Sequence, residues 1–155
     1  MTTAAGGETF ILFAVAGTTY AVRSRDVTHV EMLEQVTGVP NAAAFVDGVV
    51  FSRGQVVPAL NLRARFGFER AAYDVATRLV VVQHGGRNVG LVVDGAREFV
   101  SFDPALIQPP GTALGGLSGA YLEGIANVGG RLILVLDLAE VLTFEDPVLQ
   151  AEVQR

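Results

Sequence analysis

The two histidines, His29 and His84, are the first residues to examine for metal or acid–base chemistry. Neither lies in a cluster with carboxylates at the spacing of a metal site. Zinc and iron sites usually need three or four protein ligands at recognisable spacing. The chain also has no cysteine, which excludes a thiolate metal site, an iron–sulfur cluster, a thiol nucleophile and a disulfide. We therefore expect no metal.

Arginine supplies all eleven cationic side chains, because the chain contains no lysine. A Schiff base and a P-loop phosphate contact both need a lysine amine. The glycine-rich stretch from Gly111 to Gly119 follows Pro109 and Pro110, and we interpret it as a loop and not as a phosphate cradle. We expect no nucleotide or other organic cofactor.

Serine and carboxylate side chains leave one enzymatic alternative open. Four serines are candidate nucleophiles but lack the context of a nucleophile elbow: Ser24, Ser52, Ser101 and Ser118. A triad can be assembled from distant segments, so a small hydrolase using Asp94, Asp137 or His29 remains an alternative. No acid–base pair stands at a meaningful spacing, and we expect no catalytic residue.

Three of the polar residues have a simpler structural interpretation. Asp94 ends a predicted strand at a turn, where its carboxylate can accept hydrogen bonds from backbone N–H groups. Asn61 and Asp137 each precede a short predicted helix and are residue types that favour the N-cap position. We expect these side chains to shape the backbone.

The charge of the chain argues against nucleic acid as a partner. The formal net charge is −5 and the sequence pI is about 4.9. A protein that gains affinity by neutralising phosphates carries the opposite sign. A small β-barrel module that binds single strands by stacking remains an alternative function, but the absence of lysine and tryptophan disfavours it.

Short apolar runs between glycine, proline or polar turns predict a β-rich fold. Ten such runs are candidate strands: Phe10 to Val15, Tyr20 to Arg23, Val27 to Glu31, Val49 to Phe51, Val56 to Leu60, Leu79 to Gln83, Val89 to Val93, Glu98 to Phe102, Ile125 to Val128 and Leu132 to Leu136. Gly85-Gly86 and Gly129-Gly130 predict hairpin turns, and we expect antiparallel pairing. Brief peripheral helices are predicted at Leu62 to Phe66, Leu138 to Leu142 and Pro147 to Val153.

An internal repeat is the most informative feature of the sequence. Residues 45–66 align without a gap on residues 121–142, at a constant offset of 76. This alignment places Gly48 on Gly124, Gly54 on Gly130 and Asn61 on Asp137. Upstream, residues 11–22 match residues 80–91 at an offset of 69.

The repeat predicts an all-β fold with two five-stranded barrel lobes that share apolar surface. We expect one domain over residues 9–144, with a first lobe at about 9–70, a second at about 77–142 and uncertain, intertwined boundaries. Residues 145–155 are expected to form a helical tail. The apolar runs are too short to cross a membrane and the N-terminus has no basic region of a secretory signal, so we expect a soluble, cytoplasmic protein.

Arg53 breaks the repeat. It lies in a turn between two predicted strands, where the other half of the chain has Gly129. A symmetric barrel needs no arginine there. The planar guanidinium has five donors and suits carboxylates or backbone carbonyls on a partner, although many turn arginines are simply solvated.

Four segments of the chain resemble one known family in order and spacing. They are residues 48–67 (GVVFSRGQVVPALNLRARFG), 86–95 (GRNVGLVVDG), 121–124 (YLEG) and 131–138 (RLILVLDL). Together they are similar to the CheW family of bacterial chemotaxis coupling proteins, over about Phe10 to Leu142. The resemblance implies SH3-like barrels, no catalysis, and an adaptor or scaffold role in two-component signal transduction.

The implied partners are the regulatory domain of a CheA-type histidine kinase and the cytoplasmic tips of methyl-accepting chemoreceptors. The expected location is the cytoplasm, at receptor–kinase arrays, with no nucleic acid and no membrane insertion. The resemblance assigns five residues to the receptor-facing surface: Arg53, Gly54, Val30, Met32 and Phe99. The kinase contacts have no short motif that can be transferred, and they stay unknown.

The chain departs from the family pattern on the receptor-facing side. Phe51 and Ser52 stand where the family usually has Asn and Leu. Met32 occupies a position that is usually acidic, and Glu31 lies one residue away, which on a strand puts it on the opposite face. These departures favour a divergent receptor, or a pathway that controls motility other than flagellar chemotaxis.

Overall fold

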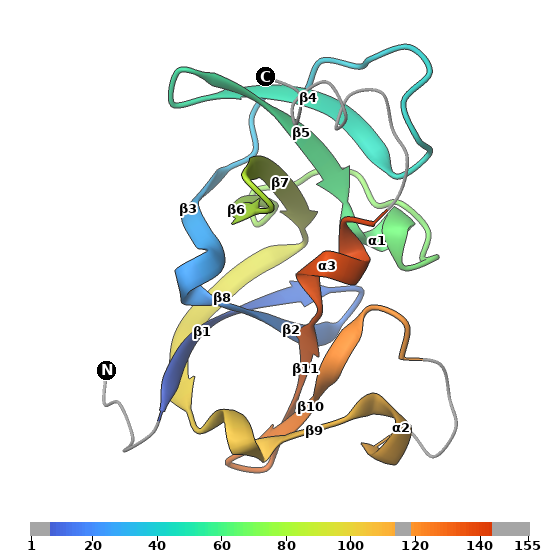
Figure 1. Cartoon of the computed structure of the whole chain (residues 1–155). Coiled ribbons are helices and arrows are strands. Elements are labelled where there is room, and N and C mark those ends of the chain that lie inside the picture. The colour runs from blue at the N-terminus through green and yellow to red at the C-terminus, as the bar shows by residue number, and fades with distance from the viewer. Residues whose placement is uncertain (1–6, 114–118, 144–155) are drawn as a thin grey trace.

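Two β-sheets lie one above the other in the computed structural model of the chain (Figure 1), which describes residues 7–113 and 119–143. The first sheet has six strands: β1 (Glu8–Val15), β2 (Thr18–Arg23), β8 (Gly95–Phe102), β9 (Ile107–Gln108), β10 (Leu122–Val128) and β11 (Arg131–Leu136). The second has five: β3 (Val27–Met32), β4 (Val46–Ser52), β5 (Gln55–Asn61), β6 (Arg78–His84) and β7 (Arg87–Val93). Each sheet is one lobe, and the expected all-β fold with two lobes is confirmed. The first lobe has six strands where five were expected, because the short β9 adds to it.

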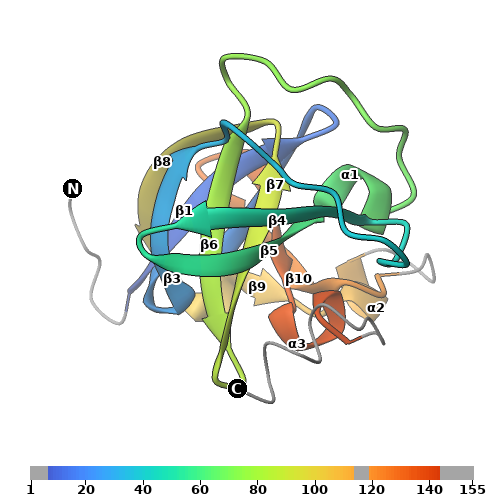
Figure 2. The ribbon, with the colours of Figure 1, turned by 90° about the horizontal axis from the view of Figure 1, so that it is seen from above.

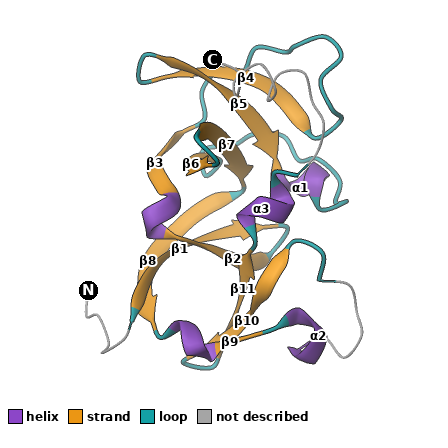
Figure 3. Cartoon of the chain, in the orientation of Figure 1, coloured by secondary structure: helices purple, strands orange, loops and turns teal. Residues whose placement is uncertain are grey.

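Only short helices accompany the sheets, as Figure 3 shows. They are η1 (Ser24–Asp26), α1 (Leu62–Arg65), η2 (Pro104–Leu106), α2 (Pro110–Ala113) and α3 (Leu138–Val141). No helix among the described residues has the length and apolar character needed to cross a membrane.

All ten predicted strands are present, and so are the two predicted helices that fall within the described residues. The sequence did not predict β9, which has two residues and is too short for an alternating pattern, or the single turn of α2. The predicted helix at Pro147 to Val153, the predicted tail at 145–155 and part of the Gly111 to Gly119 loop lie outside the described residues.

The strand order of the sheets is β8-β1-β2-β11-β10-β9 and β3-β6-β7-β5-β4. By the repeat offsets, β1 and β2 correspond to β6 and β7, while β4 and β5 correspond to β10 and β11. Each sheet therefore joins the first two strands of one repeat to the later strands of the other. This pairing differs from a first lobe at 9–70 and a second at 77–142, in which each half of the chain would form its own lobe.

Two parallel strand pairs connect the strands of one repeat to those of the other. The sequence had predicted antiparallel pairing only. Strand β2 pairs in parallel with β11, and β7 pairs in parallel with β5. The remaining strand pairs are antiparallel, including the β6–β7 hairpin at Gly85-Gly86 and the β10–β11 hairpin at Gly129-Gly130. All four of these glycines have positive φ, as type I′ hairpin turns require.

Gly48 and Gly124 occupy equivalent positions in the two lobes, where another segment of backbone passes close to the strand. Thr37 bridges to Val49 beside Gly48, and β9 pairs with β10 beside Gly124. A Cβ added at Gly48 would lie 2.1 Å from the carbonyl oxygen of Thr37, and one at Gly124 would lie 2.2 Å from that of Gln108. The paired glycines of the repeat therefore share one cause, which is the close approach of a crossing backbone.

The buried apolar side chains form three clusters. The largest, the interlobe core, takes residues from both sheets and from α3, among them Phe13, Tyr20, Leu60, Leu91 and Val141. A second cluster lies within the first sheet and a third within the second sheet. The expectation that the two lobes share apolar surface is confirmed.

Polar side chains complete the ends of the short helices. Asn61 caps α1 by accepting a hydrogen bond from the amide of Ala64 at 3.1 Å, and Asp137 caps α3 by accepting one from Glu140 at 3.2 Å. Arg65, from α1, donates from its Nε to the carbonyl of Val141 at 2.9 Å, at the end of α3. The capping roles predicted for Asn61 and Asp137 are confirmed.

Candidate functional site

Strand β3, strand β8 and the β4–β5 turn lie on the same side of the molecule. Figure 1 shows them at the left edge, with β3 above β8, and the view from above in Figure 2 agrees. The repeat relates β3 to β8, because β3 pairs with β6 as β8 pairs with β1. This side carries all five residues assigned from the sequence to a receptor-facing surface.

The five residues differ in accessibility. Arg53 and Gly54 are exposed at the β4–β5 turn. Met32 is 59% exposed on β3 and Phe99 is 55% exposed on β8, which is unusual for large apolar side chains. Val30 is half-buried and packs against the interlobe core. Four of the five could therefore contact a partner directly, while Val30 would mainly hold β3 in place.

Arg53 adopts a backbone conformation that arginine disfavours. Its φ is +49° and that of Gly54 is +83°, so both residues of the turn are left-handed. At the equivalent turn of the other lobe, Gly129 has a φ of +61° without this cost. The left-handed conformation costs a residue with a side chain about 1–2 kcal/mol. A strained side chain at an exposed turn is a reason to look for a function there.

Arg53→Asn is expected to raise the free energy of unfolding by about 0.5–1 kcal/mol, because asparagine tolerates the left-handed conformation and favours this turn type. Urea unfolding of both proteins measures the change. Ala16→Gly is a companion variant, since Ala16 has a φ of +50° in the β1–β2 turn and should be relieved in the same way. A lower stability of Arg53→Asn would contradict the strain argument.

A cluster of three polar side chains lies beside this turn. The Nε2 atom of His29 is 2.9 Å from Oε2 of Glu31 and 2.9 Å from Oγ of Ser52. The Ser52 hydroxyl also donates to Oε2 of Glu31 at 2.9 Å. Because a carboxylate only accepts, the Nε2 atom of His29 carries the proton that faces Glu31. The three side chains form a closed set, which we call the His29 cluster.

The geometry of the His29 cluster excludes the arrangement of a hydrolytic triad. In a triad the acid binds one imidazole nitrogen and the nucleophile binds the other. Here Glu31 and Ser52 share Nε2, and the serine hydroxyl gives its hydrogen to the carboxylate. The hydrolase alternative built on His29 therefore finds no support in this cluster.

A cavity of about 230 Å³ adjoins the His29 cluster and the Arg53 turn. Strands β3 to β7 of the second sheet all contribute to its lining, which consists of Thr28, His29, Ser52, Arg53, Gln55, Val57, Val81 and Asn88. Arg53 is the only arginine, lysine or carboxylate in this lining. The cavity is thus a polar recess that opens next to a cation.

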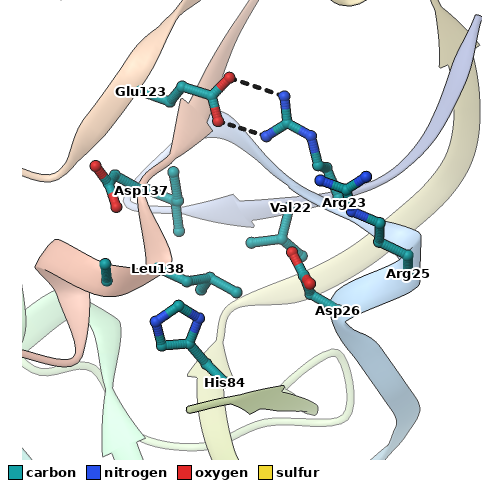
Figure 4. Close-up of a pocket in the computed structure, with 10 residues that line it drawn as sticks. Val22, Arg23, Arg25, Asp26, His84, Glu123, Asp137 and Leu138 are labelled. Carbon is teal, nitrogen blue, oxygen red and sulfur yellow. Dashed lines mark hydrogen bonds and ion pairs between the residues drawn. The ribbon is translucent and has the colours of Figure 1, made fainter.

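A second cavity of about 130 Å³ lies between the lobes (Figure 4). Arg23 lines this cavity and forms two ion pairs there. Its guanidinium makes a bidentate pair with Glu123, in which one hydrogen bond is 2.8 Å long, and its Nε donates to Glu8 at 3.1 Å. The hydrogen bonds that Arg23 donates to Glu123 raise the pKa of Arg23 above its usual value. His84, Asp26 and Asp137 line the same cavity. Among the described residues, no three histidine or carboxylate side chains are grouped to hold a metal ion.

Asp94 has the structural role that its position at a turn suggested. Its Oδ2 accepts a hydrogen bond from the amide of Ala16 at 2.7 Å, and its carboxylate pairs with Arg63 at 2.8 Å. Burial alone would raise the pKa of Asp94, but the hydrogen bonds from Arg63 and Ala16 and the charge of Arg63 outweigh it. The net effect is a lowered pKa.

Asp94→Asn is expected to reduce stability at neutral pH and to have progressively less effect in acid. A carboxyl whose pKa is lowered by folding stabilises the folded state above its ordinary pKa of about 4, and this contribution is lost as the pH falls through the lowered value. Urea unfolding at pH 7 and pH 3 measures the difference between wild type and variant. An equal cost of Asp94→Asn at both pH values would contradict the assignment.

The sequence predicted Arg53 from its break in the repeat, but it did not predict the His29 cluster. In the sequence, His29 and Ser52 are isolated polar residues on separate predicted strands, and Glu31 is only the neighbour of the position that Met32 occupies. A signal was available, because residues 29 and 31 share one face of a strand. The partner on β4 could not be identified without the fold.

Comparison with known proteins by sequence identifies relatives that align with most of the chain. The family model described as CheW-like domain matches residues 9–146. The chain is 31% identical to the chemotaxis protein CheW of Klebsiella aerogenes, over 92% of this chain and 86% of that protein. It is also 31% identical to the protein FrzA of Myxococcus xanthus, over 80% of this chain and 77% of that protein.

The fold is similar to that of a solved relative. The crystal structure of the scaffolding protein CheW from Thermoanaerobacter tengcongensis superposes with a TM-score of 0.80 and 26% sequence identity. The superposition covers 89% of this chain and 94% of the other. The two-lobed arrangement is therefore common to both proteins.

Proposed function

The chain belongs to the CheW-like domain family, and on this premise we propose that it is a non-catalytic adaptor that couples transmembrane chemoreceptors to a CheA-type histidine kinase. The observation that carries the proposal is the family match over residues 9–146, nearly the whole chain. Relatives named chemotaxis protein CheW match over nine tenths of this chain.

The exposed side chains on β3, β8 and the β4–β5 turn support a more specific proposal. We assign this side, with Arg53, Gly54, Val30, Met32 and Phe99, to the cytoplasmic tip of the receptor. The regulatory domain of the kinase is the second partner, and the complex would form in the cytoplasm at receptor–kinase arrays. Two exposed apolar side chains and a cation give this surface both contact area and polarity.

One observation favours a pathway other than flagellar chemotaxis as a second candidate. The relative FrzA is as similar in identity as the CheW of Klebsiella aerogenes, and it carries a different name. The departures at Phe51, Ser52 and Met32 all lie on or beside the proposed receptor surface. A divergent receptor would account for all three.

Reconstitution tests the adaptor function directly. The receptors and the CheA-type kinase are taken from the organism that encodes the chain, and the receptor cytoplasmic fragments are tethered to vesicles. The kinase is expected to sediment with the vesicles only when the adaptor is added. Kinase sedimentation that is unchanged by the adaptor would contradict the proposal. Receptors and kinases of both pathway types are compared in the same assay.

A further inference from the structure

The His29 cluster joins two strands that do not pair with each other. Strands β3 and β4 are the two ends of the five-stranded sheet, in the order β3-β6-β7-β5-β4. Ser52 is the last residue of β4, and its hydroxyl reaches Glu31 and His29 on β3. The cluster therefore ties the end of β4 to β3 immediately before the Arg53 turn.

The other lobe shows that the fold does not require polar side chains at two of these three positions; the third, His29, corresponds to Glu98, which pairs with Arg131 at 2.7 Å. Val30 pairs with Val80 on β6 as Phe99 pairs with Ile11 on β1, so Glu31 corresponds to Val100. Ser52 corresponds to Val128 at the offset of 76. Both valines are half-buried and pack against the apolar cluster of the first sheet.

The polar version of this contact has a physical cost. The His29 side chain is 91% buried, since 9% of it is exposed, and its Nδ1 atom has no hydrogen-bond partner among the described residues. A buried polar network that is only partly satisfied is less favourable than an apolar contact. The other lobe has valines at the positions of Glu31 and Ser52. Because the polar cluster costs stability there, we look for a role of this cluster other than folding.

The Arg53 turn supplies that role. Arg53 follows Ser52 directly, and together with His29 the two residues line the same 230 Å³ cavity. The turn is strained at Arg53, so a change in its anchoring would let the backbone relax and redirect the guanidinium. We propose that the His29 cluster positions the Arg53 turn relative to β3 for receptor binding, an inference that rests on the proposed function and extends it. His29, Glu31 and Ser52 act through Arg53 as positioning residues.

Two isosteric variants separate the hydroxyl of Ser52 from the shape of its side chain. Ser52→Thr keeps the hydroxyl and Ser52→Val replaces it with a methyl group of the same shape, and the valine at the sister position shows that a branched side chain suits this place. Binding of the receptor cytoplasmic fragment is titrated against each full-length variant. Ser52→Val is expected to bind about tenfold more weakly than Ser52→Thr, which should bind like wild type.

A double-mutant cycle shows whether the effect passes through Arg53. Arg53→Ala is combined with each Ser52 variant, and the two double variants are expected to bind the receptor fragment equally weakly, because the group being positioned is gone. Val128→Thr and wild type are the matched control pair, since they differ by the same atoms in the other hairpin. They should have equal receptor affinity.

The outcomes distinguish this inference from the proposed function. Equal affinities of Ser52→Val and Ser52→Thr would overturn the inference, and so would a tenfold difference that persists in the Arg53→Ala background. A wild-type protein that binds no receptor fragment would overturn the proposed function itself, and with it the inference. If Ser52→Val fails to melt cooperatively, Glu31→Gln repeats the comparison, because it keeps the size of the side chain and removes the charge that accepts both hydrogen bonds.

Discussion

Arg53→Glu is expected to weaken binding of the receptor cytoplasmic fragment by at least roughly thirtyfold, while the protein stays folded. An interface arginine that pairs with acceptors on a partner contributes about 2 kcal/mol or more, and charge reversal adds repulsion if a carboxylate was the acceptor. Arg53 is exposed and, among the described residues, has no ion-pair partner within the chain. Titration of the fragment against wild type and variant measures the loss.

Thermal melting of the same two proteins in the same buffer is the control. The substitution should change stability by only about 0.5 kcal/mol, because no buried group loses a partner. Equal receptor affinities of wild type and Arg53→Glu would remove Arg53 from the site.

Gly48→Ala is expected to cost about 3 kcal/mol or more of folding free energy. The new Cβ would lie 2.1 Å from the carbonyl oxygen and 2.7 Å from the carbonyl carbon of Thr37, and these backbone atoms cannot move aside as a flexible side chain could. The φ of +147° at Gly48 adds strain for any residue with a side chain. A fall in melting temperature of roughly 10 °C is the expected result.

Gly38→Ala is the matched control, because it lies next to Thr37 and a Cβ there would meet no atom within 4 Å. It should melt within a few degrees of wild type. Gly124→Ala tests the same crossing in the other lobe, where the Cβ would lie 2.2 Å from the carbonyl oxygen of Gln108. A wild-type melting temperature for Gly48→Ala would show that the crossing backbone is not fixed.

Local patterns were sufficient to predict the elements of this fold. The apolar runs and glycine turns identified every strand longer than two residues, and the repeat identified two similar lobes. The exchange of strands could not be predicted in the same way. The repeat shows that the β1-β2 and β6-β7 hairpins are alike, and that the β4-β5 and β10-β11 hairpins are alike. Either of the first two hairpins could therefore join β10-β11 with the same side chains facing the core.

The sequence predicted the part of the candidate site that depends on one residue, Arg53, which breaks the repeat. It did not predict the His29 cluster, in which three residues from two strands meet. Arg53 stood out because its counterpart is glycine. Ser52 was visible as a departure from the family pattern and Glu31 as the neighbour of the departure at Met32, and the structure shows that Ser52 and Glu31 contact each other. Because 20 residues separate them in the sequence and β3 and β4 are not backbone partners, only the fold reveals this contact.

The exchange of strands has a consequence for synthesis on the ribosome. Strands β1 and β2 emerge first, but their other partners in the sheet, β8 and β11, are translated only after β3 to β7. At about 5–20 residues per second, the nascent chain carries the unpaired edges of β1 and β2 for roughly ten seconds before β11 is available. The five-stranded sheet uses β3 to β7, which are contiguous in the sequence, and all its strands are available once β7 is made. The six-stranded sheet is completed only near the end of translation, so premature termination after β7 would leave that lobe unfinished.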